Sequence, residues 1–260
     1  MGRKLKAVLN KIERHPLDIV PSSSEKRFKQ SKHEVFNPLP IKAYFCAPSS
    51  GGKSSAAIQA INALWDCWDK VVVFAATVEV DPAFDALVEK AKKLLVKKGE
   101  DPDDPDNEVA FDSLDDLPKV LNLQAQKIKE ERSLGRKTLS QLCILIDDHL
   151  GSLRHDRHLD ALFSRGRHIG CSVFLTSQIF RGASTTVRKN IDALSIFRLP
   201  AQEYVAVASE VVGSMVDEQQ FRELYLRATA QPHSFLFIKL KAKDSSEAFF
   251  RNYTTKLVPT

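Results

Sequence analysis

The sequence predicts an α/β fold in which a mainly parallel sheet lies between two layers of helices. From Ile41 onward, short apolar runs rich in β-branched residues alternate with longer stretches of helical periodicity. Strands of a parallel sheet are buried on both faces, so this alternation is typical of a sheet that helices cover on both sides. The 260 residues are enough for one large domain with short appendages.

The expected elements follow one another in a regular order. Apolar runs predict strands over 43–46, 70–75, 142–146, 172–176, 193–199 and 234–240. Helical periodicity predicts helices over 53–65, 82–97, 117–132, 158–165, 202–212 and 217–228. The acidic stretch 99–108 predicts a surface loop, because prolines interrupt it and it lacks the glycine and closing glutamate of a calcium-binding EF-hand loop.

The first 40 residues differ from the rest in composition and predict a basic arm or linker. Residues 1–42 carry 10 Lys and Arg against 4 Asp and Glu, a charge of +6, so the rest of the chain sums to −1 of the total of +5. Such an arm is suited to nucleic acid or an acidic partner, although a solvated flexible tail is the alternative. We therefore expect an arm over 1–40 and a single folded domain over 41–260.

No stretch of the sequence predicts a membrane span or an export signal. The longest uncharged apolar runs, such as 71–76 and 143–146, are far shorter than the roughly 20 residues that a spanning helix needs. The basic first residues lack the apolar core that precedes a signal cleavage site. The four cysteines show neither paired spacing nor a metal-ligand pattern, so we expect buried thiols in a reducing compartment. The sequence therefore predicts a soluble protein that is not secreted.

Residues 47–54, Ala-Pro-Ser-Ser-Gly-Gly-Lys-Ser, fit a phosphate-binding P-loop, except that alanine replaces the leading glycine. In such a loop, backbone N–H groups and the N-terminus of the following helix surround the β-phosphate. Lys53 would contact the β- and γ-phosphates, and the Ser54 hydroxyl would bind Mg²⁺. The expected nucleotide-binding residues are Pro48, Ser49, Ser50, Gly51, Gly52, Lys53, Ser54 and Ser55. The alternative is a Gly/Ser turn before an ordinary helix. The motif makes the predicted fold a P-loop NTPase three-layer sandwich.

The apolar run Leu-Cys-Ile-Leu-Ile ends in two aspartates, Asp147 and Asp148. This is the Walker B arrangement, in which a buried strand delivers a carboxylate beside the metal. Asp147 is the expected Mg²⁺-linked acid, and Asp148 is a candidate general base, although many such ATPases carry a glutamate there. The alternative is a buried strand that ends in an acidic helix cap.

Gln178 follows the predicted strand 172–176. If that strand is inserted between the P-loop strand and the Walker B strand, Gln178 lies near the γ-phosphate, where a glutamine can sense phosphate or orient water.

Arginines flank the same strand. Arg165 and Arg167 precede it, and Arg188 follows it. An arginine can stabilise charge on a transferring phosphoryl group, often in trans from a neighbouring subunit. Arg165 and Arg167 are the leading candidates for this catalytic role and Arg188 is the next, with solvated caps or surface ion pairs as the alternative.

Four stretches occur together in an order that far fewer protein families share than share the P-loop alone. They are APSSGGKSS, LCILIDDHL, an arginine-histidine pair shortly before a strand ending in TSQ, and VRKNIDALSIFRLP. In this combination the chain, from about Ile41 to Tyr253, resembles the viral genome-packaging ATPases of the poxvirus type. These form a branch of the FtsK/HerA superfamily of DNA-pumping motors.

The resemblance implies roles for individual residues. Lys53, Ser54, Asp147, Asp148 and Gln178 would form the nucleotide site, and an arginine at the Arg165 or Arg167 position would be the inter-subunit finger. Two positions depart from the pattern. Ala47 replaces a glycine, and Asp148 replaces the usual glutamate, which leaves the identity of the water-activating base open.

The resemblance also implies a function. It is that of an ATP-driven ring of identical subunits that moves double-stranded DNA into a preformed capsid, with ATP and Mg²⁺ as cofactors and capsid proteins as partners. The protein would act at the viral assembly site in the host cytoplasm or in the virion. Within the arm, Arg3, Lys4 and Lys6 are candidate DNA contacts. The alternatives are a P-loop small-molecule kinase and a non-hydrolysing, nucleotide-gated assembly or scaffold protein.

Overall fold

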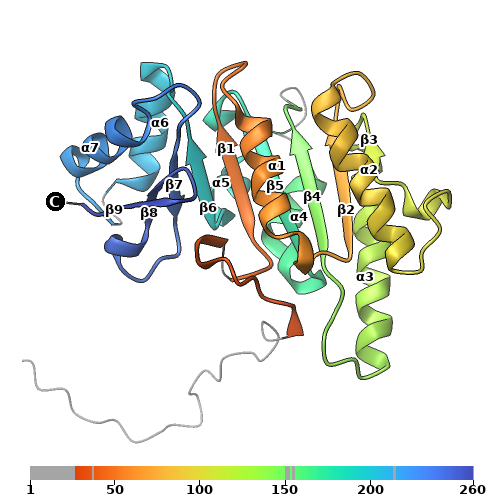
Figure 1. The fold of residues 1–260 in the computed structure, drawn as a ribbon. Helices are drawn as coiled ribbons and strands as arrows, with labels where there is room; N and C mark the ends of the chain where they lie inside the picture. Colours follow the sequence, from red (N-terminus) through yellow and green to blue (C-terminus); the bar gives the residue numbers. More distant parts are fainter. Residues whose placement is uncertain (1–26, 37, 150–152, 154–155, 213–214, 260) are drawn as a thin grey trace, which may run out of the picture.

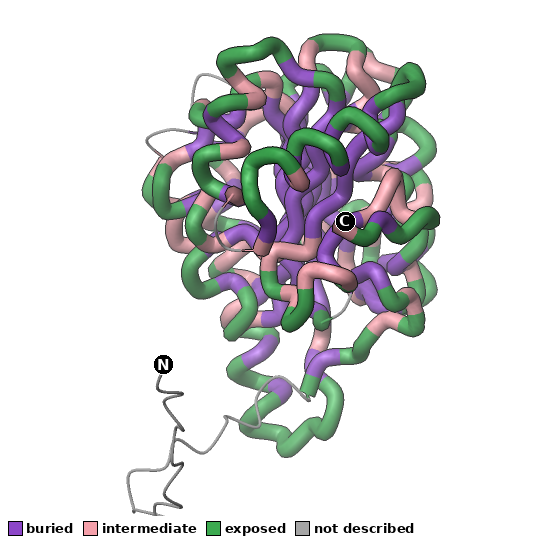
Figure 2. Tube along the Cα trace, turned by 90° about the vertical axis from the view of Figure 1, so that its left-hand side faces the viewer, coloured by how far each residue is buried: buried purple, intermediate pink, exposed green. Residues whose placement is uncertain are grey.

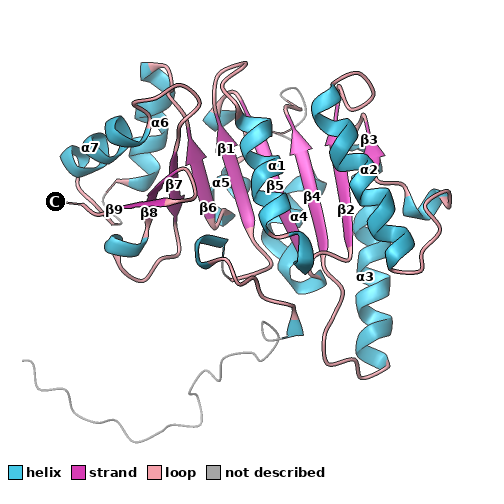
Figure 3. Cartoon of the chain, viewed as in Figure 1, coloured by secondary structure: helices cyan, strands magenta, loops and turns pink. Residues whose placement is uncertain are grey.

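The computed structural model describes residues 27–36, 38–149, 153, 156–212 and 215–259. These residues form a single sheet with helices on both of its faces (Figures 1 and 3). None of the helices in these ranges is long and apolar enough to cross a membrane.

The described sheet has nine strands in the order β3-β2-β4-β5-β1-β6-β7-β8-β9. The first six in chain order run parallel: β1 (Lys42–Cys46), β2 (Lys70–Ala75), β3 (Ala110–Phe111), β4 (Leu142–Asp147), β5 (Cys171–Ser177) and β6 (Ala193–Ile196). An antiparallel extension follows, made of β7 (Leu236–Lys239), β8 (Phe249–Arg251) and β9 (Thr255–Leu257). The carboxyl ends of the parallel strands therefore meet at one edge of the sheet.

The helices form the two outer layers. Helices α1 (Lys53–Ala63) and α2 (Pro82–Lys97) pack on one face of the sheet. The other face carries α3 (Leu117–Ser133), α4 (Arg157–Arg165), α5 (Thr185–Asn190), α6 (Ala201–Val211) and α7 (Glu218–Ala228). The predicted three-layer fold with a mainly parallel central sheet is confirmed.

The core lies on both sides of the central strands, which run as a buried band through the molecule (Figure 2). Every residue of β1, β4 and β5 is buried, and successive side chains enter opposite clusters. Phe174 of β5 illustrates the packing, since its ring centroid lies 6.4 Å from that of Phe45 and 6.3 Å from that of Trp68. Burial on both faces explains why these strands read as continuous apolar runs.

The packed structure begins earlier than Ile41, where the sequence predicts its start. Phe28, Val35, Phe36 and Leu39 are all buried. The backbone N–H of Leu139 donates to the carbonyl of Arg27 at 2.9 Å, which attaches residue 27 to the body of the fold. The proposed division into an arm and an ATPase domain remains a prediction for residues 1–26, which lie outside the described residues.

The shortest elements were not predicted. Strand β3 has two residues, β8 and β9 have three each, and α5 has six. Elements of this length do not complete the alternation or the helical periodicity that a sequence pattern requires. The predicted strands 193–199 and 234–240 are also shorter in the structure, where they end at Ile196 and Lys239.

Candidate nucleotide site

The turn between β1 and α1 has the backbone geometry of a loop that curls around a ligand. Gly52 is the N-cap of α1 with φ 95°, and Ser50 also has a positive φ of 58°. The Gly51 N–H donates to the Pro48 carbonyl at 3.0 Å and closes the turn. The loop therefore ends at the N-terminus of α1, where N–H groups without partners in the helix favour an anion.

The two glycines of this loop are required by space and by backbone conformation. A Cβ at Gly51 would lie 2.8 Å from Ala47 Cβ and 2.9 Å from the Pro48 carbonyl oxygen, too close for either to be accommodated. Gly52 occupies the left-handed region, which L-residues other than asparagine and aspartate rarely adopt.

A pocket of about 710 Å³ opens over this loop at the carboxyl ends of the strands. Its volume is in the range typical of small-molecule sites. The expected residues that line it are Ser50, Gly52, Lys53, Ser54, Ser55, Asp147 and Asp148. Pro48, Ser49 and Gly51 belong to the same loop but do not line the pocket. The fold thus brings the P-loop and the two predicted acidic residues to one pocket.

Lys53, Asp148 and Gln178 meet at a single carboxylate oxygen. Lys53 Nζ lies 3.2 Å from Asp148 Oδ2, and Gln178 Nε2 donates to the same oxygen at 2.6 Å. Only 7% of Lys53 is exposed, so this ion pair is largely shielded from solvent. Among the described residues, none donates a hydrogen bond to the other, buried oxygen of Asp148, Oδ1. The carboxylate therefore keeps one free acceptor.

Asp147 is held differently, although it is adjacent in sequence. Thr176 Oγ1 donates to Asp147 Oδ1 at 2.8 Å, and the Asp148 N–H donates to the same hydroxyl at 3.2 Å. Thr176 lies on β5, which pairs with both β1 and β4. The insertion of β5 between these strands, as predicted, places Thr176 and Gln178 beside the two aspartates.

Asp148 has φ 52°, in the left-handed region. Aspartate tolerates this conformation better than most residues. The turn directs consecutive carboxylates to different partners, Asp147 to β5 and Asp148 to Lys53.

The candidate arginines lie at the other edge of the sheet. Arg165 ends α4, and Arg167 belongs to the following turn Gly166–Ile169, which leads into the amino end of β5. Both side chains are exposed, and neither lines the pocket over the P-loop. Any contact with a nucleotide bound there would have to come from a neighbouring subunit.

Arg188, the third candidate, has structural partners. It pairs with Glu210 at 2.9 Å and donates to the Ala183 carbonyl at 2.6 Å. Its guanidinium therefore fastens α5 to α6. Arg3, Lys4 and Lys6 lie outside the described residues.

Several lining residues were not identified from the sequence, among them Thr77, Asp81, His233 and Phe235. The first two follow β2, where a polar residue after a strand was an available signal. His233 and Phe235 come from the turn before β7, which pairs with β6 and so returns beside the P-loop. His233 Nδ1 lies 3.4 Å from the position of a Cβ on Gly52. No local sequence pattern predicts this contact, because it joins segments that are distant in the sequence and meet only in the folded chain.

The chain has the fold of a P-loop ATPase, with the phosphate-loop lysine and the acidic residues in one pocket. Solved structures share it. The genome-packaging NTPase B204 from Sulfolobus turreted icosahedral virus 2, in complex with AMPPCP, aligns with a TM-score of 0.55 at 14% identity, over 82% of this chain and 96% of that one. Its complex with sulfate gives 0.56 at 13% identity, over 86% and 100%.

A secretion protein shares the core as well. The cytoplasmic domain of the type VII secretion ATPase EccC from Thermomonospora curvata aligns with a TM-score of 0.50 at 9% identity, over 85% of this chain and 24% of that one. No protein-family model and no curated protein matches the sequence. The fold that the expected resemblance implies is therefore shared with a viral genome-packaging NTPase and with a secretion ATPase.

Proposed function

We propose that this chain is an ATP-hydrolysing motor that moves viral double-stranded DNA into a preformed capsid. One observation carries the proposal: Lys53, Asp147 and Asp148 line the pocket over the P-loop, with Gln178 hydrogen-bonded to Asp148, in a fold shared with a viral genome-packaging NTPase. The similarity in fold to that NTPase supports the packaging role, and the residues of the pocket support ATP hydrolysis.

The pocket fits a nucleoside triphosphate with Mg²⁺. The loop N–H groups and Lys53 are suited to the phosphates. The Ser54 hydroxyl lies in the same pocket as the Asp147 carboxylate, and hydroxyl and carboxylate oxygens are the hard ligands that Mg²⁺ prefers. When bound, Mg²⁺ neutralises charge on the β- and γ-phosphates. Ser54 and Asp147 would hold it.

Asp148 and Gln178 would orient and deprotonate the attacking water. Asp148 Oδ2 forms an ion pair with Lys53 and accepts a hydrogen bond from Gln178. Phosphate oxygens compete for the Lys53 ammonium, so nucleotide binding would weaken the ion pair and free the carboxylate. Asp148 could then accept a proton from a water that Gln178 positions, as a general base does.

The arginines would act between subunits in a ring of identical chains. Arg165 and Arg167 are exposed at the sheet edge opposite the P-loop, so each could reach only a neighbour's nucleotide. A trans arginine stabilises charge on the transferring phosphoryl group. Mixing Arg167→Ala subunits with Asp147→Ala subunits tests this role, because some interfaces of a mixed ring would combine the intact half-site of each parent. Partial recovery of hydrolysis supports the finger, and no recovery in mixed rings excludes Arg167.

The substrate and the location follow from the packaging role. Duplex DNA would be the transported polymer, and the arm residues Arg3, Lys4 and Lys6 would contribute phosphate contacts whose strength falls with salt. Capsid proteins would anchor the ring at the viral assembly site in the host cytoplasm or in the virion.

Steady-state ATP hydrolysis by the purified protein tests the proposal directly. Rates are measured with and without long duplex DNA, at low and moderate salt, with Lys53→Ala and Asp147→Ala as controls. Stimulation by DNA that weakens with salt and disappears in both variants supports a DNA motor. Hydrolysis only with a small phosphoryl acceptor would indicate a kinase, and nucleotide binding without hydrolysis would indicate a gated scaffold.

A further inference from the structure

The two edges of the sheet carry charge of opposite sign. At the amino edge, a pocket of about 730 Å³ is lined by five cationic side chains, Arg132, Arg167, Lys239, Lys241 and Lys243, against two carboxylates, Asp192 and Glu247. Lys241 is paired with Asp192, and Lys239 donates to the Glu34 carbonyl at 3.2 Å. Lys241, Lys243 and Arg132 are exposed. The pocket therefore presents a surplus of positive charge to solvent.

The pocket over the P-loop has the opposite balance. Among the described residues that line it, Lys53 is the single lysine or arginine, against Asp81, Asp147 and Asp148. Lys53 is already paired with Asp148. A triphosphate with Mg²⁺ adds further net negative charge to this surface, which further cations would balance, and Lys53 is the single lysine or arginine that the described residues contribute to the pocket lining.

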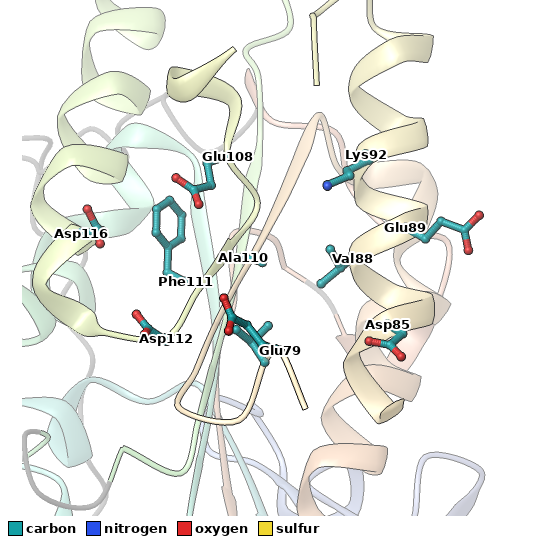
Figure 4. A pocket seen from close by; sticks show the side chains of 11 residues that line it. Glu79, Asp85, Val88, Glu89, Lys92, Glu108, Ala110, Phe111, Asp112 and Asp116 are labelled. Carbon is teal, nitrogen blue, oxygen red and sulfur yellow. The ribbon is translucent and has the colours of Figure 1, made fainter. Parts of the chain in front are cut away.

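A second acidic depression lies beside the nucleotide pocket, between α2 and the segment around β3 (Figure 4). Its volume is about 660 Å³, and its charged side chains are Lys92 and six carboxylates: Glu79, Asp85, Glu89, Glu108, Asp112 and Asp116. Figure 4 shows Glu79 and Asp112 among the acidic side chains that line the depression. The two depressions are adjacent, because residues 76–85 contribute to both. Together they form an acidic edge.

We propose that the basic pocket of one subunit docks on the acidic edge of the next subunit of the same chain. This inference rests on the proposed ring, and it names the surfaces that form the ring's interface. The contact joins two different surfaces head to tail, a type of interface that generates a ring when the rotation between subunits closes. Opposite charge steers such surfaces together and fixes their register.

The arrangement is consistent with the position of the candidate finger. Arg167 lines the basic pocket, and the nucleotide pocket is part of the acidic edge. Docking of the basic pocket on the neighbour's acidic edge therefore brings Arg167 toward the phosphates bound by the neighbour. It also places Lys241 and Lys243 against acidic residues of the neighbour. Arg165 lies two residues from Arg167 and arrives at the same interface.

Charge reversal on each surface tests the interface. One variant is Lys241→Glu/Lys243→Glu, and the other is Glu79→Lys/Asp112→Lys. All four residues are exposed, so both variants should fold. The matched control for the lysine variant is Arg222→Glu/Arg227→Glu on α7, which makes the same change of net charge at two exposed residues outside both edges. Thermal unfolding checks each fold, and sedimentation velocity with a non-hydrolysable ATP analogue measures assembly.

Each edge variant alone is expected to need at least tenfold more protein for half-assembly, whereas the control assembles as the wild type does. An equimolar mixture of the two edge variants should recover mixed assemblies. In an alternating arrangement, the reversed edge of one variant meets the reversed edge of the other, and the two unaltered edges also match. Higher salt should weaken wild-type assembly, since exposed charges are screened beyond about 10 Å at 0.1 M.

Several results would overturn the inference. They are a monomeric wild type with and without nucleotide, assembly of both edge variants at the wild-type concentration, and a mixture that forms no mixed species. Loss of DNA affinity with intact assembly in Lys241→Glu/Lys243→Glu would assign the basic pocket to nucleic acid instead. DNA-stimulated hydrolysis in the same preparations tests the proposed function separately. If the wild type assembles through these edges but does not hydrolyse ATP, the proposed motor function is refuted and the interface stands. If DNA stimulates hydrolysis and the charge reversals leave assembly unchanged, the interface is refuted and the motor function stands.

Discussion

Lys53 Nζ lies 3.2 Å from Asp148 Oδ2, so the phosphate-loop lysine and the candidate base form an ion pair. Gln178 donates to the same oxygen at 2.6 Å. A phosphate group bound at Lys53 would compete with this carboxylate. We therefore expect nucleotide binding and the release of Asp148 to be coupled through one ammonium group.

Asp148→Asn should separate binding from hydrolysis. The amide preserves the shape and tolerates the left-handed backbone, but it cannot accept a proton or hold Lys53 by charge. We expect nucleotide affinity to be unchanged or higher and hydrolysis to fall about 100-fold or more. A fluorescent ATP analogue measures the affinity, and phosphate release measures the rate. Hydrolysis at the wild-type rate would remove Asp148 from the role of base. Asp148→Glu, the residue usual in the superfamily, serves as the control that should retain activity.

Gln178→Ala should slow hydrolysis without weakening nucleotide binding. The Gln178 side chain donates to the candidate base Asp148, so its loss should disorder the attacking water while the N–H groups of the phosphate loop remain in place. The expected decrease in kcat is on the order of 10- to 100-fold, as for other misplaced reacting groups. Gln219→Ala on the surface of α7 is the comparison that should behave as the wild type does. A change in nucleotide Kd larger than the change in kcat would contradict the assigned role.

Thr176→Val should affect both stability and metal dependence. The substitution leaves Asp147 Oδ1 without its donor and the Asp148 N–H without its acceptor in a buried site. We expect the free energy of unfolding to fall by roughly 1–3 kcal/mol. The Mg²⁺ concentration for half-maximal hydrolysis should rise, because Asp147 is no longer oriented. Denaturant titration and a Mg²⁺ titration measure the two effects, and Thr176→Ser should restore both. A valine variant with wild-type Mg²⁺ dependence would show that Thr176 does not position the metal ligand.

Gly52→Ala should weaken nucleotide binding. The residue has φ +95°, a conformation that costs an L-residue about 1–2 kcal/mol, and the new methyl would lie 3.4 Å from His233 Nδ1. Relief of this strain rotates the N–H groups of the loop, so we expect affinity for ATP to fall at least tenfold. Gly99→Ala is the matched control. It has φ +81° and nothing within 4 Å of the new methyl, so it should lower stability while leaving ATP affinity unchanged.

The sequence was sufficient for the fold class and for much of the candidate site. The P-loop and the paired aspartates are recognisable because their chemistry depends on residues close together in the chain. The position of Gln178 required one topological assumption, that β5 is inserted between β1 and β4, and this order is confirmed. Local pattern and the rules of parallel sheets therefore account for the strands that carry the site.

What the sequence could not supply depends on contacts between distant segments. His233 and Phe235 reach the P-loop only because β7 turns back antiparallel beside β6. Phe28 lies among polar and basic residues in the sequence, yet it is buried against the turn at Gly170, where a Cβ would lie 2.6 Å from its ring. Neither contact has a periodic signature, since each is created when the sheet is assembled.

Strand β5 gives the two edges of the sheet a direct mechanical connection. It runs from Cys171, which follows the turn with Arg167, to Ser177, which precedes Gln178, a length of about 23 Å at the usual rise per residue. It is buried throughout and hydrogen-bonded on both sides, so it resists bending. A displacement that a cleaved phosphate imposes on Gln178 would therefore travel along one stiff segment to the edge proposed to touch the next subunit. Such a segment could coordinate ATP hydrolysis in successive subunits of a ring without any hinge between domains.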